Sequence, residues 1–355
     1  MAPRERKDVT VEQDGAAEAE EAEVKEVVDS KSREPPWRIV WRNVVSMAIL
    51  HSASLYALVL IPRSSPLTWL WCVFCFVFSA LGITAGVHRL WSHRSYKASL
   101  PLRILLAVAN SMAFQNDIFE WSRDHRVHHK YSETDADPHD ARRGFFFSHM
   151  GWLLLRKRPE VIAGGKRLDL SDLYNDPVVV WQRRADTTLL LHFMGFCAKN
   201  DKCLKGQLHS AFQDRLYKPS VIVLCFVIPT VVPWALWGES LWNAYFLAAV
   251  LRYILVLNCT WLVNSAAHMY GMRPYDCTIN PRENRFVVFA AIGEGYHNYH
   301  HTFPYDYATS EFGWKANLTT AFIDFTCWLG LAGDRHCVPT SVIEARKKRT
   351  GECSN

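Results

Sequence analysis

Eight of the fifteen histidines lie in three short strings, at residues 88–93, 125–129 and 297–301. These strings read His-Arg-Leu-Trp-Ser-His, His-Arg-Val-His-His and His-Asn-Tyr-His-His. Neutral imidazole is the commonest side-chain ligand of redox-active iron, copper and zinc. Three clusters in one chain therefore indicate a metal centre rather than three sets of isolated structural histidines.

The spacing within the strings supports ligation from helices. An α-helix turns about 100° per residue, so the three histidines of the second string fall in one sector about 100° wide. We therefore expect all three to face a single centre, and the third string repeats the spacing. His88 and His93 are about 140° apart on an ideal helix, so they converge best if the helix ends or bends between them.

Long apolar segments flank these strings and must position them. Four segments are long and apolar enough to cross a bilayer, which takes about 20 residues. They cover residues 43–61, 67–87, 219–237 and 241–263. Each pair is joined by a short turn, and the two turns carry only Arg63 and Glu239 as charged residues. Since most other basic residues lie on the opposite side, the positive-inside rule places both termini and every histidine string in the cytosol.

The charge distribution separates an acidic tail from a basic remainder. Residues 1–36 contain 11 Asp and Glu against 6 Lys and Arg, so we expect a disordered cytosolic tail without a signal peptide. The basic remainder suggests anionic head groups or a phosphorylated ligand rather than a nucleic acid. The ten cysteines show no regular spacing, so we expect buried thiols and no disulfide framework.

Five longer strings around the histidines resemble a known family. They cover residues 84–93, 115–125, 142–149, 261–268 and 293–304. From about residue 37 to 351 the chain is similar to the membrane-bound acyl-CoA delta-9 desaturases, the stearoyl-CoA desaturase family of vertebrates. The sequence around Ser122, Tyr131 and Trp242 most resembles that of the brain-associated isoform of the family.

The resemblance implies an all-α integral membrane protein with four transmembrane helices in two hairpins. A cytosolic helical cap, residues 88–184 and 264–351, would hold a di-metal centre of two iron ions. Nine histidines would be the ligands, and Asn264 would reach a metal through water. They are His88, His93, His125, His128, His129, His268, His297, His300 and His301. All-imidazole ligation also suits zinc, so the choice of iron rests on the reaction rather than on the ligands.

The resemblance also implies a set of substrate-binding residues. It consists of Asn43, Asn116, Arg123, Asp124, Arg156, Lys157 and Trp261. The physical case is best for Arg156 and Lys157, since cationic donors bind the phosphates of CoA. The alternative for these two is a juxtamembrane patch that contacts anionic lipid. Asp135, Asp137 and His139 follow the second string, and we expect the carboxylates to orient metal-bound imidazoles.

The chain departs from the family at three places. Val87 and Val127 stand where the family generally has Ala, which adds methyl groups near the metals without changing a ligand. Residues 185–215 form an atypical insertion of roughly thirty residues. Because loop-closure entropy grows slowly with length, we expect the core fold to accommodate this insertion and its deletion to preserve activity.

The implied reaction is the oxygen-dependent desaturation of a saturated long-chain acyl-CoA, such as stearoyl- or palmitoyl-CoA, to a cis double bond at carbon 9. An unactivated carbon–hydrogen bond is too strong for side-chain acids and bases and requires a strongly oxidising metal centre. Electrons would come from NADH through cytochrome b5 reductase and cytochrome b5, in the endoplasmic reticulum membrane. The resemblance leaves chain-length preference and a homo-oligomer open.

Two alternatives fit the same histidine strings. A membrane hydroxylase or methyl oxidase of lipids would yield an alcohol instead of a double bond. A metal transporter would place ionisable residues near mid-bilayer, whereas these spans carry few apart from His51 and Arg252.

Overall fold

The computed structural model describes residues 38–183 and 220–352. The expected acidic tail at 1–36 and the insertion at 185–215 therefore lie outside the described residues. From Val40 onward, the described residues belong to one compact unit.

This unit is built almost entirely from helices, with one two-stranded antiparallel pairing of β1 (Lys97–Ala98) and β2 (Ala332–Gly333). The helices in chain order are α2 (Trp41–Leu60), η1 (Ile61–Arg63), α3 (Pro66–Leu81), η2 (Gly82–Ser92), α4 (Leu100–Ala113), α5 (Ile118–Lys130), η3 (Ala141–Arg143), η4 (Phe147–Gly151), α6 (Trp152–Leu154), α7 (Pro159–Lys166), α8 (Ser171–Asn175), η6 (Ile222–Val227), α11 (Ile228–Trp237), α12 (Leu241–Ala244), η7 (Tyr245–Leu251), α13 (Arg252–Asn264), α14 (Ala266–Met269), α15 (Arg285–Ala290), α16 (His297–Thr302), α17 (Leu318–Trp328) and α18 (Thr340–Thr350).

Three continuous helical stretches in the described residues are long and apolar enough to span a membrane. They are Trp41–Arg63, Pro66–Ser92 and Leu241–Met269. The third expected span, residues 219–237, is helical over Ile222–Trp237 but falls among the shorter apolar helices. The first, second and fourth expected spans are thus present, and the count of four is not established.

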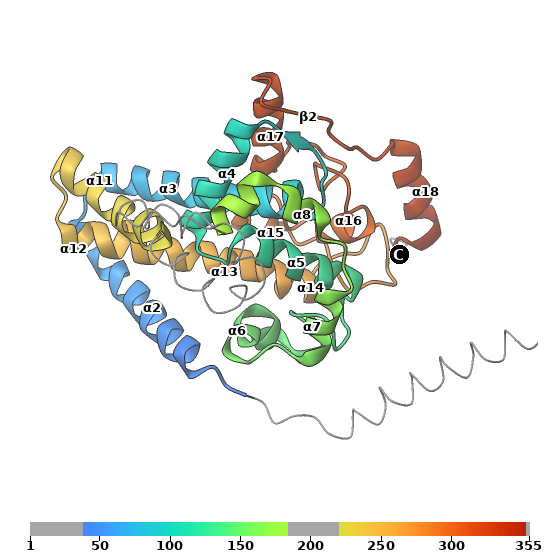
Figure 1. Ribbon diagram of the computed structural model, residues 1–355, viewed down its shortest axis with the longest axis horizontal. Coiled ribbons are helices and arrows are strands. Elements are labelled where there is room, and N and C mark those ends of the chain that lie inside the picture. Colours follow the sequence, from blue (N-terminus) through green and yellow to red (C-terminus); the bar gives the residue numbers. More distant parts are fainter. Residues whose placement is uncertain (1–37, 184–219, 353–355) are drawn as a thin grey trace, which may run out of the picture. The chain divides into compact units, whose positions relative to one another are not determined.

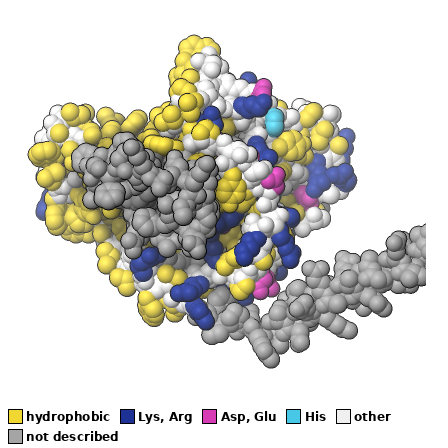
Figure 2. Space-filling model, viewed as in Figure 1, with side chains coloured by type: hydrophobic (Ala, Val, Ile, Leu, Met, Phe, Trp, Pro, Cys, Tyr) yellow, Lys and Arg dark blue, Asp and Glu magenta, His cyan; other side chains and the backbone are white. Residues whose placement is uncertain are grey.

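The apolar helices and the histidine-bearing elements occupy different ends of the unit. In Figure 1, α3, α11, α12 and α13 lie together at the left, whereas α5, α14, α16 and α18 lie at the right. Figure 2 shows hydrophobic side chains over the left end and most visible Lys and Arg side chains over the rest. We call the apolar helices α2, α3, α11, α12 and α13 the stem and the histidine-bearing remainder the cap; the stem helices include the stretches that are long and apolar enough to span a membrane.

A buried glutamate joins the two turns at the far end of the stem. The Glu239 carboxylate accepts from the Ser65 backbone N–H at 2.8 Å and from the Thr68 hydroxyl at 2.7 Å. Ser65 is also the N-cap of α3, and Pro66 occupies its first turn, where a missing N–H costs nothing. The acid that the sequence places in a turn therefore fixes one hairpin against the other.

Arg252 and His51, which lie within the expected spans, have structural partners. The buried Arg252 guanidinium donates to three backbone carbonyls, those of Ala248, Met112 and Cys225, at 3.2, 3.0 and 2.6 Å. The His51 ring lies 2.8 Å from the Met47 carbonyl. Because main-chain acceptors satisfy both side chains, neither forms a mid-membrane ion site of the kind that a transporter needs.

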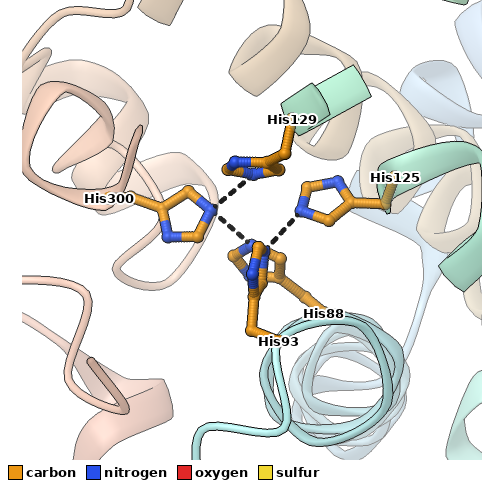
Figure 3. A group of neighbouring side chains, drawn as sticks. All are labelled: His88, His93, His125, His129 and His300. Carbon is orange, nitrogen blue, oxygen red and sulfur yellow. Dashed lines mark hydrogen bonds between the residues drawn. The ribbon is translucent and has the colours of Figure 1, made fainter. Parts of the chain in front are cut away.

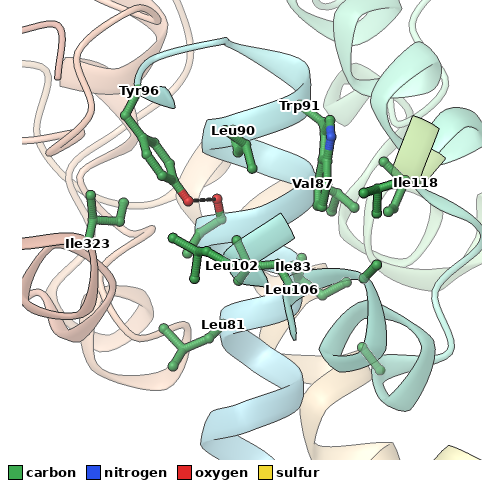
Figure 4. Close-up of a cluster of buried hydrophobic side chains, with 14 of the residues drawn as sticks. Leu81, Ile83, Val87, Leu90, Trp91, Tyr96, Leu102, Leu106, Ile118 and Ile323 are labelled. Atoms are coloured by element: carbon green, nitrogen blue, oxygen red, sulfur yellow. Dashed lines mark hydrogen bonds between the residues drawn. The ribbon is translucent and has the colours of Figure 1, made fainter. Parts of the chain in front are cut away.

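The main core lies where α3 enters the cap. Here α4 packs directly on η2, and a Cβ at Gly82 would lie 2.3 Å from the Ala109 backbone, so only glycine permits this approach. Leu102 and Leu106 of α4 pack with Ile83 and Val87 in one buried cluster (Figure 4). This packing holds the helix that carries the first histidine string.

Candidate metal centre

The structure brings all nine expected histidines together, in two groups. In each group the potential ligand atoms lie within 4.8 Å of one another. The five-histidine group consists of His88, His93, His125, His129 and His300, and the four-histidine group of His128, His268, His297 and His301.

Each of the second and third strings is divided between the two groups, so the expectation that a whole string faces one centre was wrong. On α5 and on α16, the first and last histidines, at positions i and i+4, share a group. The middle histidine, at i+3, joins the other group. The physical reason is angular: positions i and i+4 lie about 40° apart, whereas i+3 lies about 60° to the other side of i. The sector of about 100° that the three histidines span therefore faces two neighbouring centres rather than one.

The first string converges through a change of helix type. From Gly82 the chain is π-helical, and the His93 N–H donates to the His88 carbonyl at 3.1 Å, five residues back. A π turn closes an i→i+5 hydrogen bond and brings residues five apart closer in direction than an α-helix does, so both imidazoles can join the same group. The helix also ends at Ser92. The expected end or bend between the two histidines is thus confirmed.

The ring nitrogens meet at distances that suit a shared cation. In the five-histidine group, the Nε2 atoms of His93 and His125 are 2.8 Å apart, and that of His300 lies 3.0 Å from both His88 and His129 (Figure 3). Two nitrogens bound at right angles to one ion, with bonds of about 2.1 Å, would be about 3.0 Å apart. The four-histidine group shows 2.9 and 3.1 Å.

A buried nitrogen without a partner supports the same interpretation. The His128 Nε2 atom is buried and has no hydrogen-bond partner within residues 38–183 and 220–352, although a buried polar atom normally has one. Its ring lies 5.1 Å from the rings of His268 and His301, in the same group. A metal ion would satisfy this nitrogen, so the residues present fit a metal cofactor.

Three carboxylates fix the orientation of imidazoles from outside the two groups. The pairs are Glu294 Oε2 with His88 Nδ1 at 2.8 Å, Asp137 Oδ1 with His128 Nδ1 at 2.8 Å, and Glu133 Oε1 with His268 Nδ1 at 3.4 Å. A carboxylate only accepts, so each ring donates from Nδ1 and presents an unprotonated Nε2 toward its group. This is the tautomer that a metal ligand requires.

Asp137 therefore takes the orienting role expected of it, and Asp135 does not. The Asp135 carboxylate accepts from Arg158 at 3.0 Å and lies 3.7 Å from Arg142. His139 lies outside both groups and packs against the Trp152 ring at 4.3 Å.

Electrostatics favour the neutral form of six ligand candidates. Burial, followed by the neighbouring histidines, holds their pKa values well below the usual range. The six candidates are His93, His125, His129, His297, His300 and His301. An uncharged imidazole has the free lone pair that ligation needs. At His128, burial lowers the pKa but the Asp137 carboxylate outweighs it, so the net shift is upward.

Glu294 remains ionised although it is buried. Its Oε1 accepts two hydrogen bonds from the fully buried Arg89, at 2.7 and 3.1 Å. Burial raises the pKa of Glu294, but Arg89 and His88 outweigh burial and lower the pKa to about 2. The Glu294 carboxylate, which Arg89 keeps ionised, therefore places a full negative charge behind the five-histidine group.

A cavity leads from the stem to both groups. Its apolar wall comes from α3, η2 and α13 and includes Phe76, Ala80, Ile83, Val256 and Val263. At the other end it is lined by His88, His125, His128 and His297, together with Asn264 and Trp121. The Trp121 ring stacks on His125 with centroids 4.9 Å apart. An apolar ligand in this cavity would contact members of both histidine groups.

Only three of the expected substrate residues lie together. Asp124 is buried and accepts from Arg123 at 3.0 Å and from Lys157, so these three form one ionic cluster. Burial raises the pKa of Asp124, but Lys157 and Arg123 outweigh it, and the net shift is downward.

The other substrate candidates lie apart from this ionic cluster. The Asn43 amide donates to the Leu153 carbonyl at 2.7 Å, and Trp261 is buried against the stem core. Arg156 and Asn116 are exposed, and Asn116 adopts a positive φ of 79°.

Known proteins are similar to this chain over most of its length. The fatty acid desaturase family model matches residues 64–310. An acyl-CoA desaturase 1 of Tachysurus fulvidraco is 62% identical over 92% of this chain and 88% of its own length. The chain belongs to the fatty acid desaturase family. A human stearoyl-CoA desaturase 5 is also 62% identical, over 89% of this chain and 86% of its own length, and a Cyprinus carpio acyl-CoA desaturase is 61% identical. The resemblance stated from the sequence is therefore confirmed.

Sequence reasoning missed Glu294 and Glu133 as orienting residues. Glu294 lies three residues before His297, but its partner His88 is more than 200 positions away, so no local pattern joins them. Glu133 has a positive φ of 58°, which few non-glycine residues adopt, and this conformation is visible only in the structure.

Proposed function

We propose that this desaturase removes two hydrogens from a saturated long-chain acyl-CoA and forms a cis double bond at carbon 9. The supporting observation is the apolar cavity between α3 and α13 that ends at both histidine groups. In the balanced reaction, the acyl chain loses two hydrogens, dioxygen accepts four electrons, and two water molecules form. Two of the electrons come from an external donor.

We assign two iron ions to the site, one to each histidine group, with Asn264 as a water-mediated ligand of one of them. Bound iron would supply the one-electron oxidising chemistry that breaking an unactivated carbon–hydrogen bond requires. Zinc fits the imidazoles equally well but cannot change its oxidation state, so the reaction selects iron.

The protein's own residues would position the chain and exclude water. Phe76, Ile83 and Val256 would pack against the acyl chain and exclude water from the methylene carbons that lie near His88 and His125. At the polar end of the substrate, Arg123, Asp124, Arg156 and Lys157 would hold the CoA moiety, with Asn43, Asn116 and Trp261 completing that site. The exposed guanidinium of Arg156 suits a phosphate.

We further propose that NADH supplies the electrons through cytochrome b5 reductase and cytochrome b5. The basic cap would suit an acidic donor. In this proposal the protein lies in the endoplasmic reticulum membrane with four spans, the helix Ile222–Trp237 completing the set, and with both termini cytosolic.

Expression in desaturase-deficient cells tests this function. Fatty acid profiling should show monounsaturated products with the double bond at carbon 9, and none from a His128→Ala or His300→Ala variant that still reaches the membrane. A hydroxylated product would favour the hydroxylase alternative. An unchanged profile from the unsubstituted protein would refute desaturation, provided that metal analysis finds both sites loaded.

A further inference from the structure

Helix α15 separates the apolar cavity from the exterior. It presents small residues to the cavity and large exposed rings to the outside. Ala290 and Ala291 at its C-terminal end line the cavity together with Val263 and Asn264 of α13. On the opposite side, Phe286 and Phe289 are 65% and 86% exposed. Side chains three apart lie on one helix face, so these two rings form a single outer apolar face.

The surroundings of α15 indicate what covers this outer face. The helix packs on Leu262 and Val263, in the last turn of α13, inside the apolar stretch Leu241–Met269. The face therefore continues the surface of a membrane-spanning helix at its histidine end. Figure 1 shows α15 beside α13 and α14, whereas α18 lies at the far edge of the cap. Phenylalanine rings at this level suit the acyl region just below the head groups.

Helix α15 packs outside the main core. Its residues Val287 and Val288 are buried, and Val287 packs in a small cluster with Ala266, Ala267 and Ala291 that is separate from the main core. Displacing α15 would therefore leave the packing around η2 intact.

The segment that follows α15 adopts unusual backbone conformations. Ile292 has φ of 46°, which is rare for a β-branched residue, and Gly293 has φ of 120°. The next residue, Glu294, is held by Arg89. The chain thus changes direction between a helix that packs outside the main core and a fixed anchor, which is where a hinge would lie.

We propose that α15 is a lateral gate through which the acyl chain passes between the cavity and the bilayer leaflet around the stem. The inference rests on the proposed function, because it takes the cargo to be the hydrocarbon tail of an acyl-CoA. Outward movement of α15 about Ile292 and Gly293 opens the wall formed by Ala290 and Ala291. The tail then enters or leaves without crossing water, while the CoA end stays at the membrane surface.

The first test concerns the lipid contact and does not require activity. A photo-crosslinking phenylalanine analogue replaces Phe289, or replaces Val342 on α18 as the matched control, which is 44% exposed. After irradiation in phosphatidylcholine vesicles with a radiolabelled acyl chain, we expect lipid adducts at position 289 at about ten times the level at 342, since only the former lies in the acyl region. Equal labelling at the two positions would overturn the lipid contact and the gate.

The second test concerns passage through the wall. Ala290→Trp and Ala290→Gly proteins are loaded with tritiated stearoyl-CoA in nanodiscs without reductant and are chased with unlabelled ligand. Because Ala290 lines the cavity, a Trp side chain at this position would obstruct the passage, so the Trp variant should load and release about tenfold more slowly. The Gly variant should be as fast as the unsubstituted protein or faster.

The outcomes separate the gate from the function. Unchanged exchange in Ala290→Trp, or equal slowing in both variants, would overturn the gate while saturable binding in the unsubstituted protein leaves the function standing. Absence of saturable binding in the unsubstituted, metal-loaded protein would overturn the proposed function and the gate's cargo together.

Discussion

Replacing Glu294 should separate metal binding from folding, because this one carboxylate serves both. One oxygen accepts from His88 Nδ1, and the other accepts twice from the buried Arg89. Arg89 keeps other acceptors on Tyr307, Thr320 and Asn317. Glu294→Ala therefore leaves a buried unpaired charge, which costs about 3–5 kcal/mol of folding free energy.

Two further variants separate the effect on folding stability from the effect on metal affinity. In Glu294→Gln the amide oxygen still accepts from Arg89, so the stability cost should be only about 1–3 kcal/mol. The imidazole of His88 nevertheless loses its ionised acceptor, so the affinity of the five-histidine group for metal should fall about 10–100-fold. The double variant Arg89→Met, Glu294→Gln removes both charges and should recover stability but not metal affinity.

The assay combines metal titration with unfolding of the metal-free protein in detergent. Metal per protein is measured by mass spectrometry, and stability by denaturant titration. Asp324→Asn is the control, because its ion pair with Arg335 is partly exposed and should contribute less than about 1 kcal/mol. Two metals bound at unchanged affinity in Glu294→Gln would refute the orienting role. A double variant no more stable than Glu294→Ala would refute the account of Arg89.

Three further predictions follow from other parts of the molecule. Asp137→Asn should weaken metal binding by the four-histidine group about 10–100-fold and leave the five-histidine group loaded; loss of both metals would contradict two separable sites. Burial raises the pKa of Glu283 to about 8, so the folded state holds a proton that the unfolded state loses above its ordinary pKa of 4.5, and stability falls as pH rises between these values. Glu283→Gln should therefore melt at a higher temperature than the unsubstituted protein near pH 8 but not near pH 5, and parallel melting curves across pH would contradict this. A glycan acceptor at Ser64 should be modified in the endoplasmic reticulum and one at residue 355 should not; the reverse pattern would refute the proposed topology.

The sequence by itself determined the chemistry and the broad architecture. Histidine at close spacing beside long apolar stretches already indicates metal ligands at the ends of membrane helices, because few other residue patterns serve that purpose. The five longer strings around these residues sufficed to indicate the family. His268 is an isolated histidine. Its position at the cytosolic end of the fourth expected span made it a plausible ligand, the resemblance included it in the ligand set, and the structure places it in the four-histidine group.

Only the tertiary structure decided how the ligands are shared. The helical periodicity predicts which side chains lie on one face, but it cannot say whether one centre or two lie opposite that face. The division of α5 and α16 between two groups depends on where four distant elements meet. The same holds for Glu294 and Arg89, whose partners are separated by more than 200 residues, and for the π-helical turn that aligns His88 with His93. Contacts between remote segments depend on packing, and packing has no local signature in the chain.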